Sequence, residues 1–181
     1  FTFFGFNVSK ITNNSIYPFK KTIKVYFEPV NTNPKPLYSD FNYISLFWEG
    51  FRTNNKIDFI EVNSSEESDV TIKWIKEYSD NQLGYTFEGK LVELGYGDSK
   101  CDGVWRPYTQ FTTEKILLHE LGHVLGKSHV NDSGDIMYYQ LPKQYSFEVN
   151  GEGINGGVIS GGIIGNCRDI LDYKRKGALV N

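Results

Sequence analysis

The chain has 181 residues and a formal net charge of -3, from 19 basic and 22 acidic side chains. Apolar residues make up 39% of the chain and aromatic residues 15%, which excludes disorder caused by a lack of buriable surface. Basic and acidic residues are interspersed and no basic run exceeds 174–176, so nucleic acid is not an expected partner. No stretch approaches the ~20 apolar residues of a membrane-spanning helix, so no membrane span is expected.

The length predicts a single folded domain over residues 1–181. Residues 1–6 lack the charged start of a signal peptide, and because the chain opens at Phe1 rather than Met we expect a trimmed start. The two cysteines, Cys101 and Cys167, are compatible with one disulfide in an oxidising compartment, although their spacing alone decides nothing.

The first half of the chain predicts a sheet with one helix inserted. Apolar residues alternate with polar ones in three segments, and a fourth strand follows the turn-prone Asn81 and Gly84. The predicted strands are 22–27, 56–62, 69–74 and 90–95. Between the first two, Ser39 can cap an amphipathic helix that continues to Phe51.

A second helix is predicted from about 112 to 125, after a loop over 95–107 that is rich in Gly, Asp and Pro. Glu114 is expected in its first turn, where a negative charge is favourable, and Gly126 can end the helix.

The chain changes character after this helix, because 127–166 shows little periodicity and contains a glycine-rich tract, 151–165. We expect a flexible loop for the tract. The alternative is a β-hairpin built on Val158, Ile159, Ile163 and Ile164. A short closing helix is predicted over 168–176, with Asn166 as its cap.

All 3 histidines of the chain lie in one window, 119–129. On a helix, His119 and His123 project from one face in adjacent turns, so they can share one ion. Gly126 permits a sharp reversal that brings His129 back as a third ligand. Three imidazoles leave one position of a tetrahedral zinc open, which indicates a catalytic rather than a structural site. Glu120 can lean over the same face and act as general base towards a water on the ion.

This segment matches His-Glu-x-x-His-x-x-Gly-x-x-His at every fixed position and therefore resembles the metzincin zinc peptidases. Met137, the only methionine, lies in Asp135-Ile136-Met137-Tyr138 and resembles the methionine turn that lies beneath the metal in that family. The segments 59–62 and 68–72 resemble strands of the matrixin branch, and the likeness covers about 22–139.

The sequence also departs from the matrixin pattern. No proline follows Tyr138, the tract 151–165 is foreign to the pattern, and the loop 95–107 lacks the histidines that hold a second, structural zinc in many matrixins. We therefore expect one zinc ion. Calcium is a weaker possibility at Asp98, Asp102 and Gly103, for which a solvated turn is preferred.

The resemblance implies an α+β fold: a twisted, mostly parallel sheet with two helices in an N-terminal subdomain, residues 1–126, then an active-site cleft. A small irregular C-terminal subdomain with a closing helix would follow, residues 127–181. It implies a secreted zinc endopeptidase that acts on protein or peptide substrates. A latent form with a filled cleft and a zinc-stabilised binding module are the alternatives.

Finer expectations follow from the same resemblance. The strand 91–96 either pairs with an extended substrate or lies inside the sheet. Tyr139 stands where the astacin and serralysin branches carry a metal-approaching tyrosine, so it either donates to the oxyanion or simply packs. Independently of the resemblance, a disulfide between Cys101 and Cys167 is preferred over a thiolate on the zinc. The pocket wall after Met137 has as its candidates Tyr138, Tyr139, Gln140, Leu141 and Pro142.

Overall fold

The computed structural model describes residues 17, 20–31, 33, 57–152 and 156–180. The helix expected from Ser39 to Phe51 and the start of the chain at Phe1 lie outside these residues.

A five-stranded sheet forms the larger part of the described structure, with the strand order β2-β1-β3-β5-β4. Neighbouring strands are parallel except β4, which runs antiparallel to β5. The predicted α+β class with a mostly parallel sheet is thus confirmed. The strands are β1 (Thr22–Phe27), β2 (Asp58–Glu61), β3 (Val70–Ile75), β4 (Gly84–Phe87) and β5 (Leu91–Gly95).

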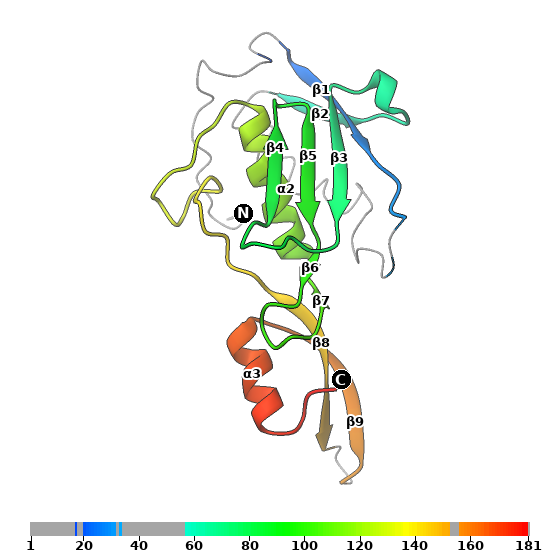
Figure 1. Cartoon of the computed structure of the whole chain (residues 1–181), viewed down its shortest axis with the longest axis vertical. Helices are drawn as coiled ribbons and strands as arrows, with labels where there is room; N and C mark the ends of the chain where they lie inside the picture. The colour runs from blue at the N-terminus through cyan, green and yellow to red at the C-terminus, as the bar shows by residue number, and fades with distance from the viewer. Residues whose placement is uncertain (1–16, 18–19, 32, 34–56, 153–155, 181) are drawn as a thin grey trace, which may run out of the picture.

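The core lies between this sheet and the helix α2 (Gln110–Val124), which runs behind β4 and β5 in Figure 1. The period-two pattern of the strands explains the packing, since Ile23 and Val25 of β1 and Ile72 of β3 are all 0% exposed. Leu117 and Leu121, one turn apart on α2, are also 0% exposed and meet this face.

Two expectations for the sheet are wrong. Gly84 was expected in a turn but begins β4, and β5 does not offer an edge to a substrate because it pairs with β3 on one side and β4 on the other. The interior alternative for 91–96 is therefore confirmed, and β4 is the edge strand on this side of the sheet as the structure describes it.

The helix α2 begins two residues earlier than predicted. Thr109 is its N-cap, and the Thr109 side chain accepts a hydrogen bond from the backbone N–H of Thr112. Glu114 therefore lies beyond the first turn, contrary to expectation. It is 2% exposed, burial raises its pKa, and Gln110 Nε2 donates to it at 2.7 Å.

After α2 and a long irregular segment, the chain forms the hairpin of β8 (Tyr145–Glu152) and β9 (Val158–Gly165), which projects away from the main sheet in Figure 1. The loop expected for 151–165 is wrong and the hairpin alternative is confirmed. The sequence signal that was missed lies before the glycine tract, where the aromatic residues Tyr145 and Phe147 are spaced by two, as on one face of a strand. The structure buries both of them, at 2% and 4% exposure.

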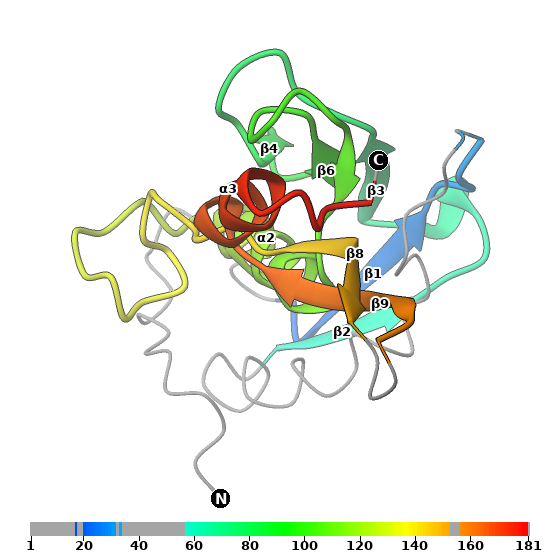
Figure 2. The same ribbon diagram turned by 90° about the horizontal axis from the view of Figure 1, so that it is seen from below.

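The closing helix is confirmed as α3 (Cys167–Arg175), with Asn166 and Asp169 forming a capping box. Figure 2 shows α3 against the hairpin. Within the described residues, no helix combines the length and the apolar content needed to cross a membrane.

A disulfide joins Cys101 to Cys167, with Cα atoms 5.4 Å apart. The preferred pairing is confirmed, and because neither cysteine is free, the alternative of a thiolate on zinc is wrong. The bond ties the loop before α2 to the first residue of α3.

The loop between the short strands β6 (Gly97–Asp98) and β7 (Arg106–Pro107) is a turn with exposed residues, as expected, but its two aspartate side chains are buried. The Asp98 and Asp102 side chains are 3% and 1% exposed. Lys143 Nζ lies 2.6 Å from Asp98, and Arg106 lies 2.9 Å from Asp102. The carboxylate oxygens that calcium would need are thus bound by the chain's own cations.

Candidate active site

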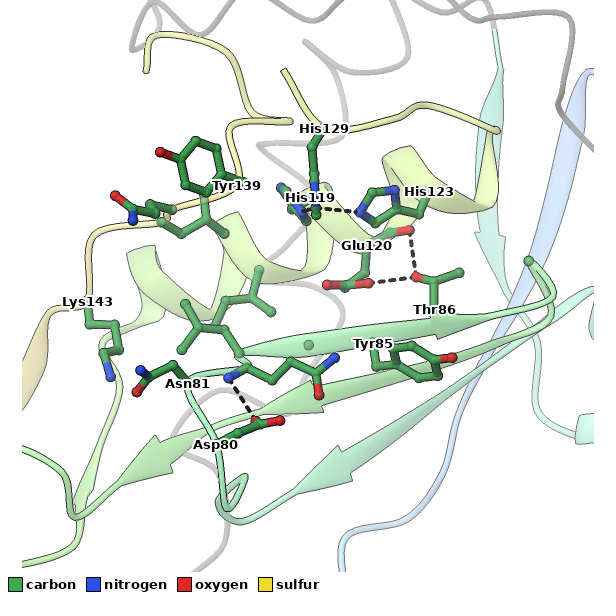
Figure 3. Close-up of a pocket in the computed structure, with 17 residues that line it drawn as sticks. Asp80, Asn81, Tyr85, Thr86, His119, Glu120, His123, His129, Tyr139 and Lys143 are labelled. Carbon is green, nitrogen blue, oxygen red and sulfur yellow. Dashed lines mark hydrogen bonds between the residues drawn. The ribbon is translucent and has the colours of Figure 1, made fainter. Parts of the chain in front are cut away.

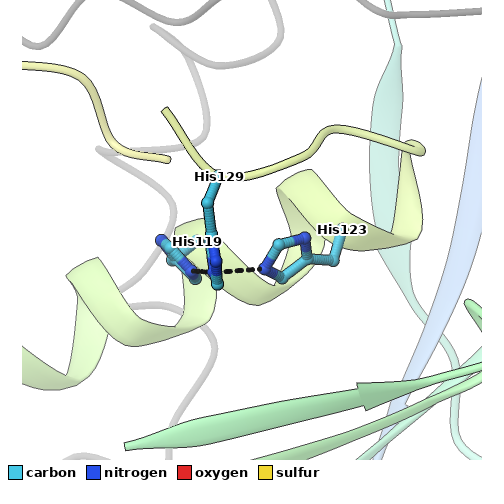
Figure 4. Close-up of side chains that lie close together, drawn as sticks. All are labelled: His119, His123 and His129. Atoms are coloured by element: carbon cyan, nitrogen blue, oxygen red, sulfur yellow. Dashed lines mark hydrogen bonds between the residues drawn. The ribbon is translucent and has the colours of Figure 1, made fainter. Parts of the chain in front are cut away.

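The three histidine side chains converge beside α2, as Figure 4 shows. His119 and His123 stand on the helix in adjacent turns, and their ligand atoms and that of His129 all lie within 4.8 Å of one another. His129 Nε2 is 3.1 Å from the Nε2 atoms of both helix histidines. The structure therefore brings together the residues that the motif predicts.

Gly126 makes this convergence possible. The helix ends at Val124 with Leu125 as its C-cap, and Gly126 has a φ of 78°, in the left-handed region that a side chain with a Cβ disfavours. The N–H of Lys127 then donates to the carbonyl of Gly122 at 2.9 Å, which closes the reversal. The chain is thereby directed back over the helix so that His129 meets the other two imidazoles.

The hydrogen bonds of the helix histidines fix which ring nitrogen faces the centre. His119 Nδ1 lies 2.7 Å from the carbonyl oxygen of Ile136, and His123 Nδ1 lies 2.8 Å from that of Lys127. Because a carbonyl only accepts, both Nδ1 atoms must carry the proton. Their Nε2 lone pairs then face His129, which can donate at most one proton to them. A cation bound by all three nitrogens satisfies this arrangement, so the residues present fit a zinc ion.

Burial keeps these imidazoles ready to bind a cation. It lowers the pKa of His119 to about 4 and also lowers the pKa of His123. Both rings are therefore neutral at pH 7, which is the form that binds a metal ion.

Met137 lies under the part of α2 that carries His119 and His123, and it is 0% exposed. A Cβ at Gly122 would be 2.2 Å from its sulfur, so Gly122 is what allows the methionine to approach. Asp135 accepts from the backbone N–H of Met137 at 2.8 Å, and the next carbonyl back along the chain, that of Ile136, holds His119. The turn therefore orients a candidate ligand directly.

Glu120 projects from α2 towards β4 and is 5% exposed (Figure 3). Burial raises the pKa of its carboxyl group to about 7, although a hydrogen bond from Thr86 opposes this shift. Thr86 Oγ1 lies 2.7 Å from Glu120 Oε2. A buried carboxyl group with a pKa near neutrality can both accept and release a proton, as a general base must.

The candidate ligands and Glu120 line a cleft of about 950 Å³ between β4, α2 and the segment after Met137. Of the predicted wall residues, Tyr139, Gln140 and Leu141 line it, whereas Tyr138 and Pro142 do not. Tyr139 is 53% exposed there and its ring packs beside that of Tyr138, with 4.7 Å between centroids.

Sequence reasoning missed the wall formed by β4, which includes Gly84 and Thr86. A signal was present, because Tyr85 and Phe87 alternate with these smaller residues as strand residues do. Gly84 suggested a turn, and for this reason the strand was not predicted.

Comparisons with known proteins agree with this geometry. The family model of the matrixins matches residues 20–157. The chain is also 28% identical over 114 residues to human matrix metalloproteinase-20, and the match covers 55% of this chain and 23% of that protein. Since the family model spans well over half of the chain, including the three converging histidines, this protein belongs to the matrixin family.

Proposed function

We propose that the chain is a zinc-dependent endopeptidase in which His119, His123 and His129 bind one zinc ion and Glu120 is the general base. Membership of the matrixin family implies the class of enzyme. The observation that carries the residue roles is the convergence of three imidazoles within 4.8 Å, in the cleft that Glu120 also lines. A site needed only for folding has no use for a buried carboxyl group beside it, which argues against a binding module.

The chemistry divides between the ion and the chain. When bound, zinc supplies Lewis acidity that polarises the scissile carbonyl and acidifies a bound water. Glu120 accepts a proton from the attacking water on its carboxylate and passes it to the leaving amine. Its burial in the cleft wall keeps bulk water from competing for that proton. No covalent intermediate with the protein is expected.

The substrate is proposed to be an extended peptide or unfolded protein. In the described structure one side of β4 pairs with β5 and the other is free beside the cleft, so β4 rather than β5 can add a peptide strand. Tyr139 is proposed to donate to the oxyanion, since it is exposed and lines the same cleft as the three histidines.

We further propose that residues 1–181 act as one catalytic domain, with halves 1–126 and 127–181 on the two sides of the cleft, and that the protein is secreted. The disulfide supports both proposals, because it links the two halves covalently and such bonds persist in oxidising compartments.

Two variants distinguish the proposed role in proton transfer from the proposed role in zinc binding. Glu120→Gln keeps the size of the side chain but cannot accept the proton, so it should bind about one zinc per chain while hydrolysis falls by roughly 10²- to 10⁴-fold. His123→Ala should lose zinc affinity itself. Glu66→Gln, the same change at an exposed residue, is the control and should match the parent.

The measurements are zinc content after dialysis and cleavage of an unfolded protein, with and without a chelator. If Glu120→Gln cleaves as fast as the parent, the proposed base is wrong. If the parent holds zinc but cleaves no peptide, a latent form or a binding module replaces the proposal.

A further inference from the structure

The inner face of β4 is shaped around one side chain of α2. Strand alternation turns Tyr85 and Phe87 outward, where they are 46% and 49% exposed, and turns Gly84 and Thr86 towards the helix. Glu120 reaches across from α2 into this space, and Figure 3 shows its carboxylate beside Thr86.

Thr86 holds one edge of the carboxylate. Its Oγ1 lies 2.7 Å from Glu120 Oε2 and 3.0 Å from the backbone carbonyl oxygen of the same residue. A hydroxyl has a single proton, and the ionised carboxylate is the stronger and nearer acceptor, so the hydrogen bond runs to Oε2. Among the described residues, Thr86 Oγ1 is the side-chain donor that hydrogen-bonds to the Glu120 carboxylate.

Because Gly84 has no side chain, it leaves room for the rest of the Glu120 side chain. A Cβ at this position would lie 2.7 Å from Glu120 Oε1 and 2.8 Å from its Cγ. Real side chains do not pack this closely, so any larger residue at Gly84 must displace the carboxylate or the strand.

We propose that Gly84 and Thr86 are positioning residues that hold the Glu120 carboxylate in its working orientation. The inference rests on the proposed function of Glu120 as general base. With Oε2 held by Thr86, Oε1 is the oxygen that takes the proton from the attacking water and later gives it to the leaving amine. The Thr86 hydrogen bond survives this cycle, because Oε2 accepts it whether or not Oε1 carries a proton.

The consequence is that the edge strand both lines the cleft and orients the base. Loss of the Thr86 hydroxyl should lower kcat and leave KM nearly unchanged, since the hydroxyl faces Glu120 and not the free edge of the strand. Damage to peptide pairing along β4 would instead raise KM.

The test compares Thr86→Val, which keeps the shape and removes the hydroxyl, with Thr86→Ser, which keeps the hydroxyl. Thr71→Val, the same exchange on β3 and away from the cleft, is the control. We expect kcat to fall about tenfold or more in Thr86→Val, to return to within a few-fold of the parent in Thr86→Ser, and to be unchanged in Thr71→Val. Zinc content should be the same in all of them.

Gly84→Ala provides a second, independent arm. It should lower kcat through displacement of Glu120, whereas Gly151→Ala, a strand glycine with no atom within 4 Å of the added Cβ, should not.

Crystal structures of the zinc-loaded parent and Thr86→Val give a readout that does not depend on activity. In the parent the carboxylate should lie within about 3.2 Å of Thr86 Oγ1, and in Thr86→Val it should turn away. A parent structure in which Glu120 makes no contact with Thr86 overturns the inference, as does full kcat in Thr86→Val. A zinc-loaded parent that cleaves nothing overturns the proposed function instead, while the crystal structures still decide whether Thr86 and Gly84 hold Glu120.

Discussion

Replacing Gly122 with alanine tests how closely the methionine beneath the candidate metal site supports α2. Two effects oppose each other. Alanine in place of glycine inside a helix stabilises the helix by about 1 kcal/mol. The added Cβ, however, would lie 2.2 Å from Met137 Sδ and 3.1 Å from its Cε. Met137 is 0% exposed, so it has no solvent to move into.

Overpacking of this kind costs about 1 to 3 kcal/mol, so we expect Gly122→Ala to lower the free energy of unfolding by about 1 kcal/mol despite the better helix former. Met137→Ala leaves a cavity and should cost about 2 to 5 kcal/mol by itself. In that background the clash is gone, and Gly122→Ala should raise the free energy of unfolding by about 1 kcal/mol. The effect of Gly122→Ala on the free energy of unfolding should therefore change sign between the two backgrounds.

The assay is urea denaturation of the parent, the two single variants and the double variant, at one fixed free zinc concentration because bound metal adds to stability. The difference between the two backgrounds should be a coupling energy of about 1 to 3 kcal/mol. Equal effects of Gly122→Ala in both backgrounds would refute the reasoning, since the contact with Met137 could not then be what demands a glycine.

Three further outcomes are expected. Reduction of the Cys101–Cys167 bond, whose ends are 66 residues apart, should lower the free energy of unfolding by about 4 kcal/mol from loop entropy, measured by urea denaturation with and without reductant. Burial favours the protonated form of Asp98, but hydrogen bonds from Lys143 and Tyr108 outweigh it and hold its pKa below the ordinary value. The ionised carboxylate therefore contributes stability above about pH 4 that is lost as the pH falls through the lower folded pKa, and Tm measured against pH should show this loss in the parent and not in Asp98→Asn. Tyr139→Phe should lower kcat if its hydroxyl serves the oxyanion, and full kcat on a peptide would leave that residue a packing role.

The candidate site was largely predictable from sequence, because its chemistry is encoded locally. His119 and His123 are one helical turn apart, and the left-handed glycine at 126 directs the chain so that His129 joins them. Such relations depend on backbone geometry over a few residues. The role of Met137 was predicted from its resemblance to a known turn, and its burial under Gly122 supplies the physical reason.

Features that depend on distant partners were not predictable in the same way. Gly84 suggests a turn until α2 is known to place Glu120 against it. Asp98 looks like a surface residue of a glycine-rich loop, yet it is buried because Lys143 and Tyr145 come from far along the chain to meet it. The tract 151–165 becomes a strand only because a preceding segment rich in aromatic residues pairs with it. Local sequence propensity carries no information about such contacts between distant residues.

The position of the disulfide has a consequence for the proposed peptidase activity, because a protease can cut its own chain. The three histidines and the hairpin's first strand all lie between Cys101 and Cys167, as does the long irregular segment after α2. Exposed irregular segments are where proteases cut most readily. A single cut in that interval would leave the two fragments covalently joined, so a nicked molecule would run at full mass on a non-reducing gel and as two pieces after reduction. If the chain has the proposed activity, the bond should therefore keep both sides of the cleft joined after a first autolytic cut.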